Sequence, residues 1–177
     1  MSERWKKGLL AAGWNLRKAV ELALDIEEMA AELYRELARK WEDTESLRAL
    51  FAKLADDEVA HQDGFRDLLA GVELRERQGA SPLDGECLKA IAHGCFFAEE
   101  RGVLSGIENA AGREQVLDKV LKFENATILY YRGLKDVLGA SPTLEAMIAQ
   151  EKRHAIEVMR AMDGSSPSSR HGTSTAS

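Results

Sequence analysis

Two short motifs in the sequence combine side chains that could hold a metal ion. Glu58-x-x-His61 and Glu151-x-x-His154 each place a carboxylate three residues before an imidazole. Residues at i and i+3 lie on one face of an α-helix, so each motif can direct both groups toward the same ion. Mixed carboxylate and imidazole ligation suits iron or manganese. The motifs therefore indicate metal chemistry, with Fe or Mn as the candidate ions.

Both motifs interrupt a stripe that is otherwise apolar. The stripe around the first motif consists of Phe51, Leu54, Phe65, Leu68 and Val72. The stripe around the second motif consists of Leu144, Met147, Val158 and Ala161. Steps of three and four residues are typical of the core-facing side of a helix. We therefore expect the two glutamates and two histidines to point into a helical core.

Two further segments carry a glutamate in the same kind of stripe. Glu27 is followed seven residues later by Tyr34, and Glu124 by Tyr131. The two glutamates are 97 residues apart and the two Glu-x-x-His motifs are 93 apart. The near-equal offsets reveal an internal repeat, in which each half contributes one glutamate, one tyrosine and one Glu-x-x-His motif.

The repeat places its polar residues at matching heights. In an antiparallel helical hairpin, residues equidistant from the turn lie side by side. Glu27 and Glu58 are equidistant from a turn expected near residues 42–43, and Glu124 and Glu151 from one near 137–138. Each pair lies ~20 Å from its turn at 1.5 Å per residue. We therefore expect four carboxylates and two imidazoles to converge inside the bundle.

Such a cluster needs cations. A single buried carboxylate costs several kcal/mol or takes up a proton, and four unpaired carboxylates would repel one another. Two divalent ions would offset their charge. The candidate ligands are Glu27, Glu58, His61, Glu124, Glu151 and His154.

Neighbouring acidic residues are less suitable as ligands. Glu28 aligns with a polar face, and Asp57 and Glu157 fall off the apolar stripes. His93 is interpreted as an ordinary histidine of the middle segment.

Four long helices must position these residues. They are expected over residues 15–41, 46–76, 113–138 and 142–162, with a less regular, glycine-interrupted helix over 84–108. Two hairpins joined by one long connection predict an all-α, ferritin-like antiparallel four-helix bundle. We assign residues 15–162 to this bundle, 1–14 to an N-terminal extension and 163–177 to a disordered tail.

Composition agrees with one helical domain and excludes several classes. The chain has 177 residues, 31% of them charged, and a net charge of −6. An acidic balance with pI ≈ 5.3 argues against nucleic-acid binding, which usually needs a basic patch. No apolar run reaches the ~18 residues of a membrane span, and the N-terminus is a poor signal peptide. We expect a cytoplasmic protein with no membrane partner.

The stretches that carry these residues resemble the rubrerythrin family of the ferritin-like superfamily. They are IEEMAAELYRELA, LFAKLADDEVAHQDGF, FENATILYYRGLKDVLG and LEAMIAQEKRH, within residues 15–162. The resemblance implies that Glu58 and Glu151 bridge two metals, and that Glu27 with His61 and Glu124 with His154 are terminal ligands. It also implies that Tyr34 and Tyr131 hold carboxylates by hydrogen bonds and pass electrons, which makes them the candidate catalytic residues.

Two departures from the family bear on function. Leu121 stands where rubrerythrins carry an additional glutamate, which weakens the case for a peroxidase-specific iron site. The paired CxxC motifs of a rubredoxin-like domain are absent, so an external electron donor such as a rubredoxin-like protein is expected.

The resemblance favours a di-iron oxidoreductase that reduces H₂O₂ or O₂, with a homodimer as the expected assembly. A ferroxidase or iron-handling protein is one alternative. A non-enzymatic metal-binding or structural bundle is the other.

Overall fold

The computed structural model describes residues 14–77, 82–97, 107, 110 and 112–164 of the chain. Its elements are α2 (Leu16–Lys40), α3 (Glu45–Arg77), α4 (Pro82–Ala92), the π-helix η1 (His93–Phe97), α5 (Arg113–Leu138) and α6 (Pro142–Met162). No strand occurs within these described ranges. The predicted all-α class is therefore confirmed. The proposed N-terminal extension and C-terminal tail lie almost entirely outside the described residues.

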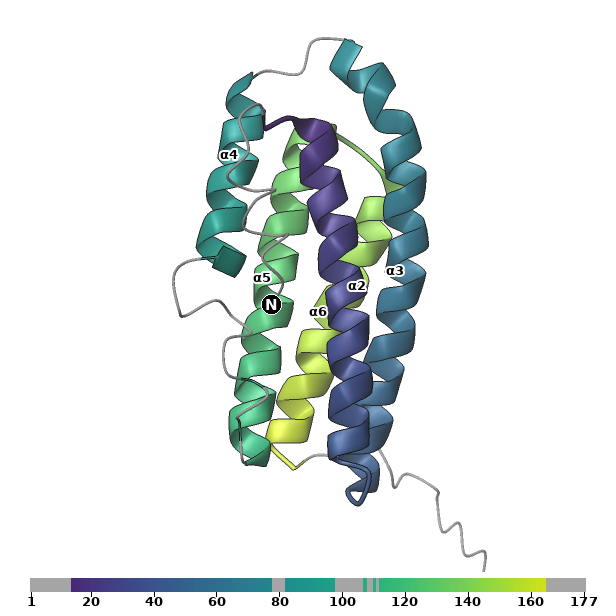
Figure 1. Cartoon of the computed structure of the whole chain (residues 1–177), viewed down its shortest axis with the longest axis vertical. Helices are drawn as coiled ribbons and strands as arrows, with labels where there is room; N and C mark the ends of the chain where they lie inside the picture. The colour runs from purple at the N-terminus through teal and green to yellow at the C-terminus, as the bar shows by residue number, and fades with distance from the viewer. Residues whose placement is uncertain (1–13, 78–81, 98–106, 108–109, 111, 165–177) are drawn as a thin grey trace, which may run out of the picture.

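The four long helices form two hairpins that pack against each other. α2 packs along α3, and α5 packs along α6 (Figure 1). The hairpins meet where α3 contacts α6 and α2 contacts α5. α4 lies on the outside of the bundle, beside α5, in the long connection between the hairpins (Figure 1). This arrangement is the ferritin-like four-helix bundle expected from the repeat.

Local sequence signals explain where the helices begin and end. Asn15 is the N-cap of α2, and its side-chain oxygen accepts a hydrogen bond from the backbone N–H of Lys18 at 2.9 Å. Ser141 caps α6 in the same way, and Pro142 takes the first helical position. Gly139 ends α5 with φ 74°, a conformation that glycine adopts without steric penalty.

The connection between the hairpins is described only in part. A less regular, glycine-interrupted helix over 84–108 was predicted, and within the described residues α4 ends at Ala92 and is followed by the π-helix η1. Ile107 lies in a bend rather than in a helix. The predicted interruption at Gly94 lies where α4 gives way to η1, and glycine in a helix interior is destabilising. Residues 98–106 and 108 of the predicted segment lie outside the described residues.

A glycine on α5 allows α4 to approach closely. A Cβ atom added to Gly133 would lie 2.9 Å from Cδ1 of Ile91 and 3.3 Å from Cδ2 of Leu88. The absence of a side chain therefore lets α4 lie against α5. A second contact joins η1 to α5, where the rings of Phe96 and Tyr130 pack edge to face with centroids 5.8 Å apart.

The apolar residues of the helices concentrate inside the bundle. The largest fully buried side chains include Tyr34, Phe51, Phe65 and Phe123. None of the helices in the described part of the chain is long and apolar enough to cross a membrane.

Candidate metal centre

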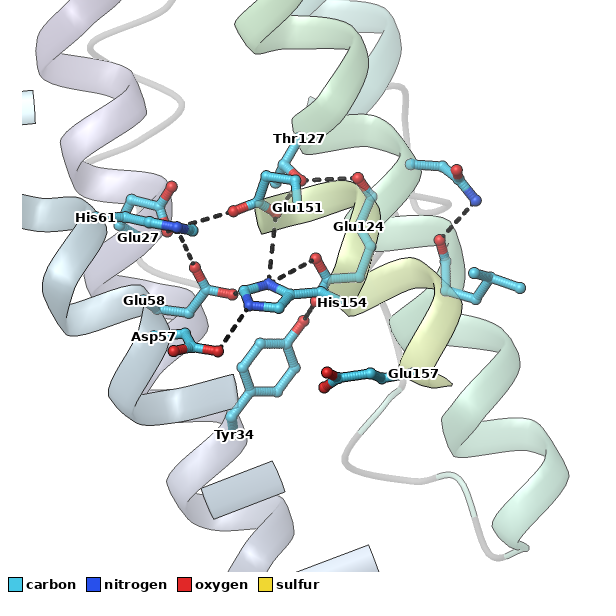
Figure 2. A network of polar contacts seen from close by, with 12 residues as sticks. Glu27, Tyr34, Asp57, Glu58, His61, Glu124, Thr127, Glu151, His154 and Glu157 are labelled. Carbon is cyan, nitrogen blue, oxygen red and sulfur yellow. Dashed lines mark hydrogen bonds and ion pairs between the residues drawn. The ribbon is translucent and has the colours of Figure 1, made fainter. Parts of the chain in front are cut away.

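Six polar side chains from four helices converge in the centre of the bundle (Figure 2). Each is at most 3% exposed to solvent, although all six are ionisable. They are the residues expected from the sequence: Glu27, Glu58, His61, Glu124, Glu151 and His154. The structure therefore brings together the whole predicted set.

The six residues form two overlapping groups. Glu27 and His61 complete one group, Glu124 and His154 complete the other, and Glu58 with Glu151 belong to both. Within each group, the candidate ligand atoms lie within 4.8 Å of one another. Two adjacent positions, each surrounded by three carboxylates and one imidazole, are thus available for cations.

The two shared glutamates turn one oxygen toward each histidine. Oε2 of Glu58 lies 2.9 Å from Nδ1 of His61, and Oε1 lies 3.5 Å from Nδ1 of His154. Oε1 of Glu151 lies 2.8 Å from Nδ1 of His61, and Oε2 lies 3.9 Å from Nδ1 of His154. Each carboxylate therefore has one oxygen on the side of each position, where it would bridge two bound ions.

The other two glutamates each face one histidine. Oε2 of Glu27 lies 3.6 Å from Nδ1 of His61, and Oε2 of Glu124 lies 3.6 Å from Nδ1 of His154. Their second oxygens are occupied by tyrosines from the opposite half of the repeat. The Tyr131 hydroxyl donates to Glu27 Oε1, and the Tyr34 hydroxyl donates to Glu124 Oε1.

The tyrosines are suited to donate these hydrogen bonds. Burial, followed by the neighbouring Glu124 charge, raises the pKa of Tyr34 well above its usual value. Burial and the Glu27 charge raise the pKa of Tyr131 in the same way. Both phenols keep their protons, so each fixes the orientation of one glutamate.

Two further side chains reach the cluster: Thr127, which no motif in the sequence indicated, and Asp57, which was set aside as a ligand because it lies off the apolar stripe. The Thr127 hydroxyl lies 2.9 Å from Glu151 Oε2 and also 2.8 Å from the backbone oxygen of Glu124. Asp57 Oδ2 lies 3.0 Å from Nε2 of His154 (Figure 2). Asp57 is off the apolar stripe, as expected, but still reaches a histidine of another helix. Its position one residue before Glu58 was the only available signal.

The remaining acidic and histidine candidates lie away from the cluster. Glu157 forms an ion pair with Lys53 at 2.9 Å instead of facing the bundle centre. His93 is exposed and belongs to neither ligand group.

Without metal, protons must offset the charge of the cluster. Burial and the Glu58 charge raise the pKa of Glu27 well above its usual value. Burial and the Glu151 charge raise the pKa of Glu124 to about 8. Burial alone would lower the pKa of His154, but the carboxylates of Glu124 and Glu58 raise it to about 11. The metal-free cluster therefore holds extra protons on carboxyl and imidazole groups.

The site fits divalent cations. Glu124 Oε2 and His154 Nδ1 are buried, and neither has a hydrogen-bond partner among the described residues. Buried polar atoms normally have a partner, and a metal ion is the partner that a carboxylate oxygen and an imidazole nitrogen can share. Four carboxylates and two imidazoles are a donor set suited to iron or manganese.

The metal-free protein is expected to lose stability as pH rises from about 6 to about 9. The pKa of Glu124 is about 8 in the fold, against 4.5 for the free group. Its contribution to the unfolding free energy is present at low pH and is lost as pH rises through 8. His154, with a pKa of about 11 against 6.5, acts with the same sign.

Thermal unfolding in the presence of a chelator checks this expectation. We expect the unfolding midpoint to fall by several degrees across the range, and metal loading to abolish the fall because metals displace the same protons. A midpoint of the chelated protein that rises with pH would contradict the assigned protonation.

Comparison with known proteins agrees with the geometry. The rubrerythrin family model matches residues 18–85, which contain α2 from its third residue onward, all of α3 and three of the six clustered residues. Neither curated proteins nor solved structures give a match. The predicted resemblance to the rubrerythrin family is thus confirmed over residues 18–85, within an all-α, ferritin-like four-helix bundle.

Proposed function

We propose that this protein is a di-iron oxidoreductase that reduces H₂O₂ or O₂ with electrons from an external donor. The observation that carries the proposal is the orientation of Glu58 and Glu151, each with one oxygen toward each histidine. Two shared carboxylates would hold a pair of ions close enough to act on one small molecule. The rubrerythrin match over residues 18–85 supports iron as the metal.

The bound iron pair would supply two electrons, one from each ferrous ion, which with two protons convert one H₂O₂ to two water molecules. The protein would support this reaction by fixing the orientation of the carboxylates that hold the iron. Tyr34, Tyr131 and Thr127 fix three of the carboxylates by hydrogen bonds. The bundle core excludes bulk water from all six clustered groups.

The two tyrosines are the proposed catalytic residues, because they touch the clustered carboxylates and could pass electrons to the centre. The ring of Tyr131 lies 4.9 Å from Phe65 and 6.1 Å from Tyr130, between centroids. The proposed donor is a separate protein of the rubredoxin type, since Cys87 and Cys95 form no CxxC pair.

Leu121 favours a second candidate, iron oxidation with O₂ as the oxidant. It is half-buried, packs against the core and offers no carboxylate where rubrerythrins have an additional glutamate. A ferroxidase that passes Fe³⁺ to a partner needs only the six-residue cluster, so the same site supports it.

Stopped-flow absorbance tests the proposal. The protein is loaded with Fe²⁺ without oxygen and mixed with H₂O₂ or with O₂. We expect at least one oxidant to oxidise the protein-bound iron faster than it oxidises free Fe²⁺. Equal rates for bound and free iron would overturn the proposed activity.

Two controls separate the candidates. Faster reaction with O₂ than with H₂O₂, repeated on each new addition of Fe²⁺, would favour the ferroxidase. Light scattering then gives the assembly, since a dimer cannot store iron in a cage. A Zn²⁺-containing protein that reacts with neither oxidant would favour a structural bundle.

A further inference from the structure

The two metal positions are built from equivalent residues but have different surroundings. The repeat relates Glu58 to Glu151 and His61 to His154, with an offset of 93 residues. With the same offset, Asp57 corresponds to Gln150, Lys53 to Ala146, and Glu157 to Gly64. Each of the charged residues Asp57, Lys53 and Glu157 therefore has an uncharged counterpart in the other half of the repeat. The asymmetry lies immediately outside the six clustered residues.

At one metal position, the ring nitrogen of His154 that points away from the cluster has a carboxylate partner, which anchors the ring. Its Nε2 lies 3.0 Å from Asp57 Oδ2, which is the acceptor for an Nε2–H proton (Figure 2). Asp57 is held in turn by Lys53, whose Nζ lies 2.9 Å from Asp57 Oδ2 and 2.9 Å from Glu157 Oε2. The imidazole is thus tied to an ion-pair network that begins at the protein surface.

This anchor decides which nitrogen of His154 faces the cluster. With Nε2–H donated to Asp57, Nδ1 is the nitrogen that faces Glu58 and Glu124, at 3.5 and 3.6 Å, and it would give up its proton when a metal binds. Hydrogen bonding of the outer nitrogen to a carboxylate fixes the tautomer and ring orientation of a ligating histidine and raises its basicity. The position beside His154 is therefore organised before a metal arrives.

On the other side, His61 has no such anchor. Its Nε2 is buried and has no hydrogen-bond partner among the residues described, so the amide of Gln150 does not reach it. A side chain at position 64 would be obstructed, because a Cβ atom on Gly64 would lie 2.9 Å from Sδ of Met147. Nε2 of His61 is thus buried without the carboxylate partner that Nε2 of His154 has.

We propose that Asp57 is a positioning residue that makes the two metal positions inequivalent. The position formed by Glu124 and His154 binds its ion more tightly and fills first, and the position formed by Glu27 and His61 fills second. This inference rests on the metal centre of the proposed function, but not on its reaction with an oxidant. Loss of a carboxylate behind a ligating histidine typically weakens metal binding ~10–100-fold.

Titration of the metal-free protein with Co²⁺ tests the order of filling. Calorimetry and visible absorbance are expected to show two binding steps in the unmodified protein. Asp57→Ala should weaken the tighter step ~10–100-fold and leave the weaker step in place. Asp56→Ala, which removes an exposed carboxylate one residue away, should leave both steps unchanged.

Two single-position variants assign the steps. Glu27→Ala should remove the weaker step and keep the tighter one, whereas Glu124→Ala should do the opposite. In the Co²⁺-loaded protein, Asp57→Ala should also accelerate solvent exchange of the His154 ring N–H, seen by NMR as a metal-shifted signal. A purely structural role of Asp57 would not move that signal.

The outcomes distinguish this inference from the proposed function. Two equal steps in the unmodified protein, or two steps that Asp57→Ala leaves unchanged, would overturn the inference but not the metal centre. No binding of Co²⁺ by the unmodified protein would overturn both. If Asp57→Ala fails to fold by circular dichroism, Lys53→Met at the half-exposed lysine replaces it, with a smaller loss expected in the same step.

Discussion

Glu58→Ala is expected to abolish binding of both metal ions. Its two oxygens lie 2.9 Å from His61 Nδ1 and 3.5 Å from His154 Nδ1, so it belongs to both candidate ligand groups. The substitution leaves each position with only one shared carboxylate, that of Glu151. It also removes one of the four negative charges that attract the two cations.

Glu27→Ala is the matched comparison for that result. Glu27 is equally buried but belongs to one group only, so this substitution should reduce the metal content from two ions to one. Metal analysis of the two purified variants, after loading with Fe²⁺ without oxygen, gives the number of ions that each variant binds. A Glu58→Ala protein that retains one tightly bound ion would contradict the bridging assignment.

Metal loading is expected to produce the largest change in stability. A ligand that binds only the folded protein adds about 4 kcal/mol at a thousandfold excess over its dissociation constant. Two sites at that excess would raise the free energy of unfolding by roughly 8 kcal/mol. The physical reason lies in the buried charge. Two divalent ions would neutralise the four carboxylates, which otherwise repel one another or take up protons.

Chemical denaturation with and without metal measures this difference. The midpoint should fall on addition of a chelator and recover when Fe²⁺ or Mn²⁺ is restored. Glu58→Ala provides the control, because a variant that binds no metal should show the same midpoint in both conditions. Equal stability of the loaded and chelated unmodified protein would show that the cluster is not a metal site.

The sequence by itself determined the helices and the residues that converge. Helix ends follow local rules, and Asn15, Gly139 and Pro142 mark them in the sequence as in the structure. The 3.6-residue period places Glu58 and His61 on one buried face whatever the helix packs against. Equal distances from a turn then place paired glutamates at the same height, because an antiparallel hairpin has little freedom along its axis.

The connection between the hairpins could not be predicted in the same way. A less regular, glycine-interrupted helix over 84–108 was expected, and in the described part of that segment α4 ends at Ala92, η1 follows and Ile107 lies in a bend. Propensity is a weak guide here because α4 has only 11 residues, and helices shorter than ~12–15 residues are marginal without tertiary packing. The close approach of Ile91 to Gly133 shows the kind of contact that decides where α4 lies.

Only the tertiary structure decided which side chains meet across the repeat. Tyr34 donates to Glu124 and Tyr131 to Glu27, so each tyrosine holds a glutamate of the other half. Asp57 reaches His154 on α6, while its counterpart Gln150 does not reach His61. These contacts depend on the rotation of each helix about its axis and on the distance between helices. Both are set by the packing of the whole core, which a repeat in the sequence does not encode.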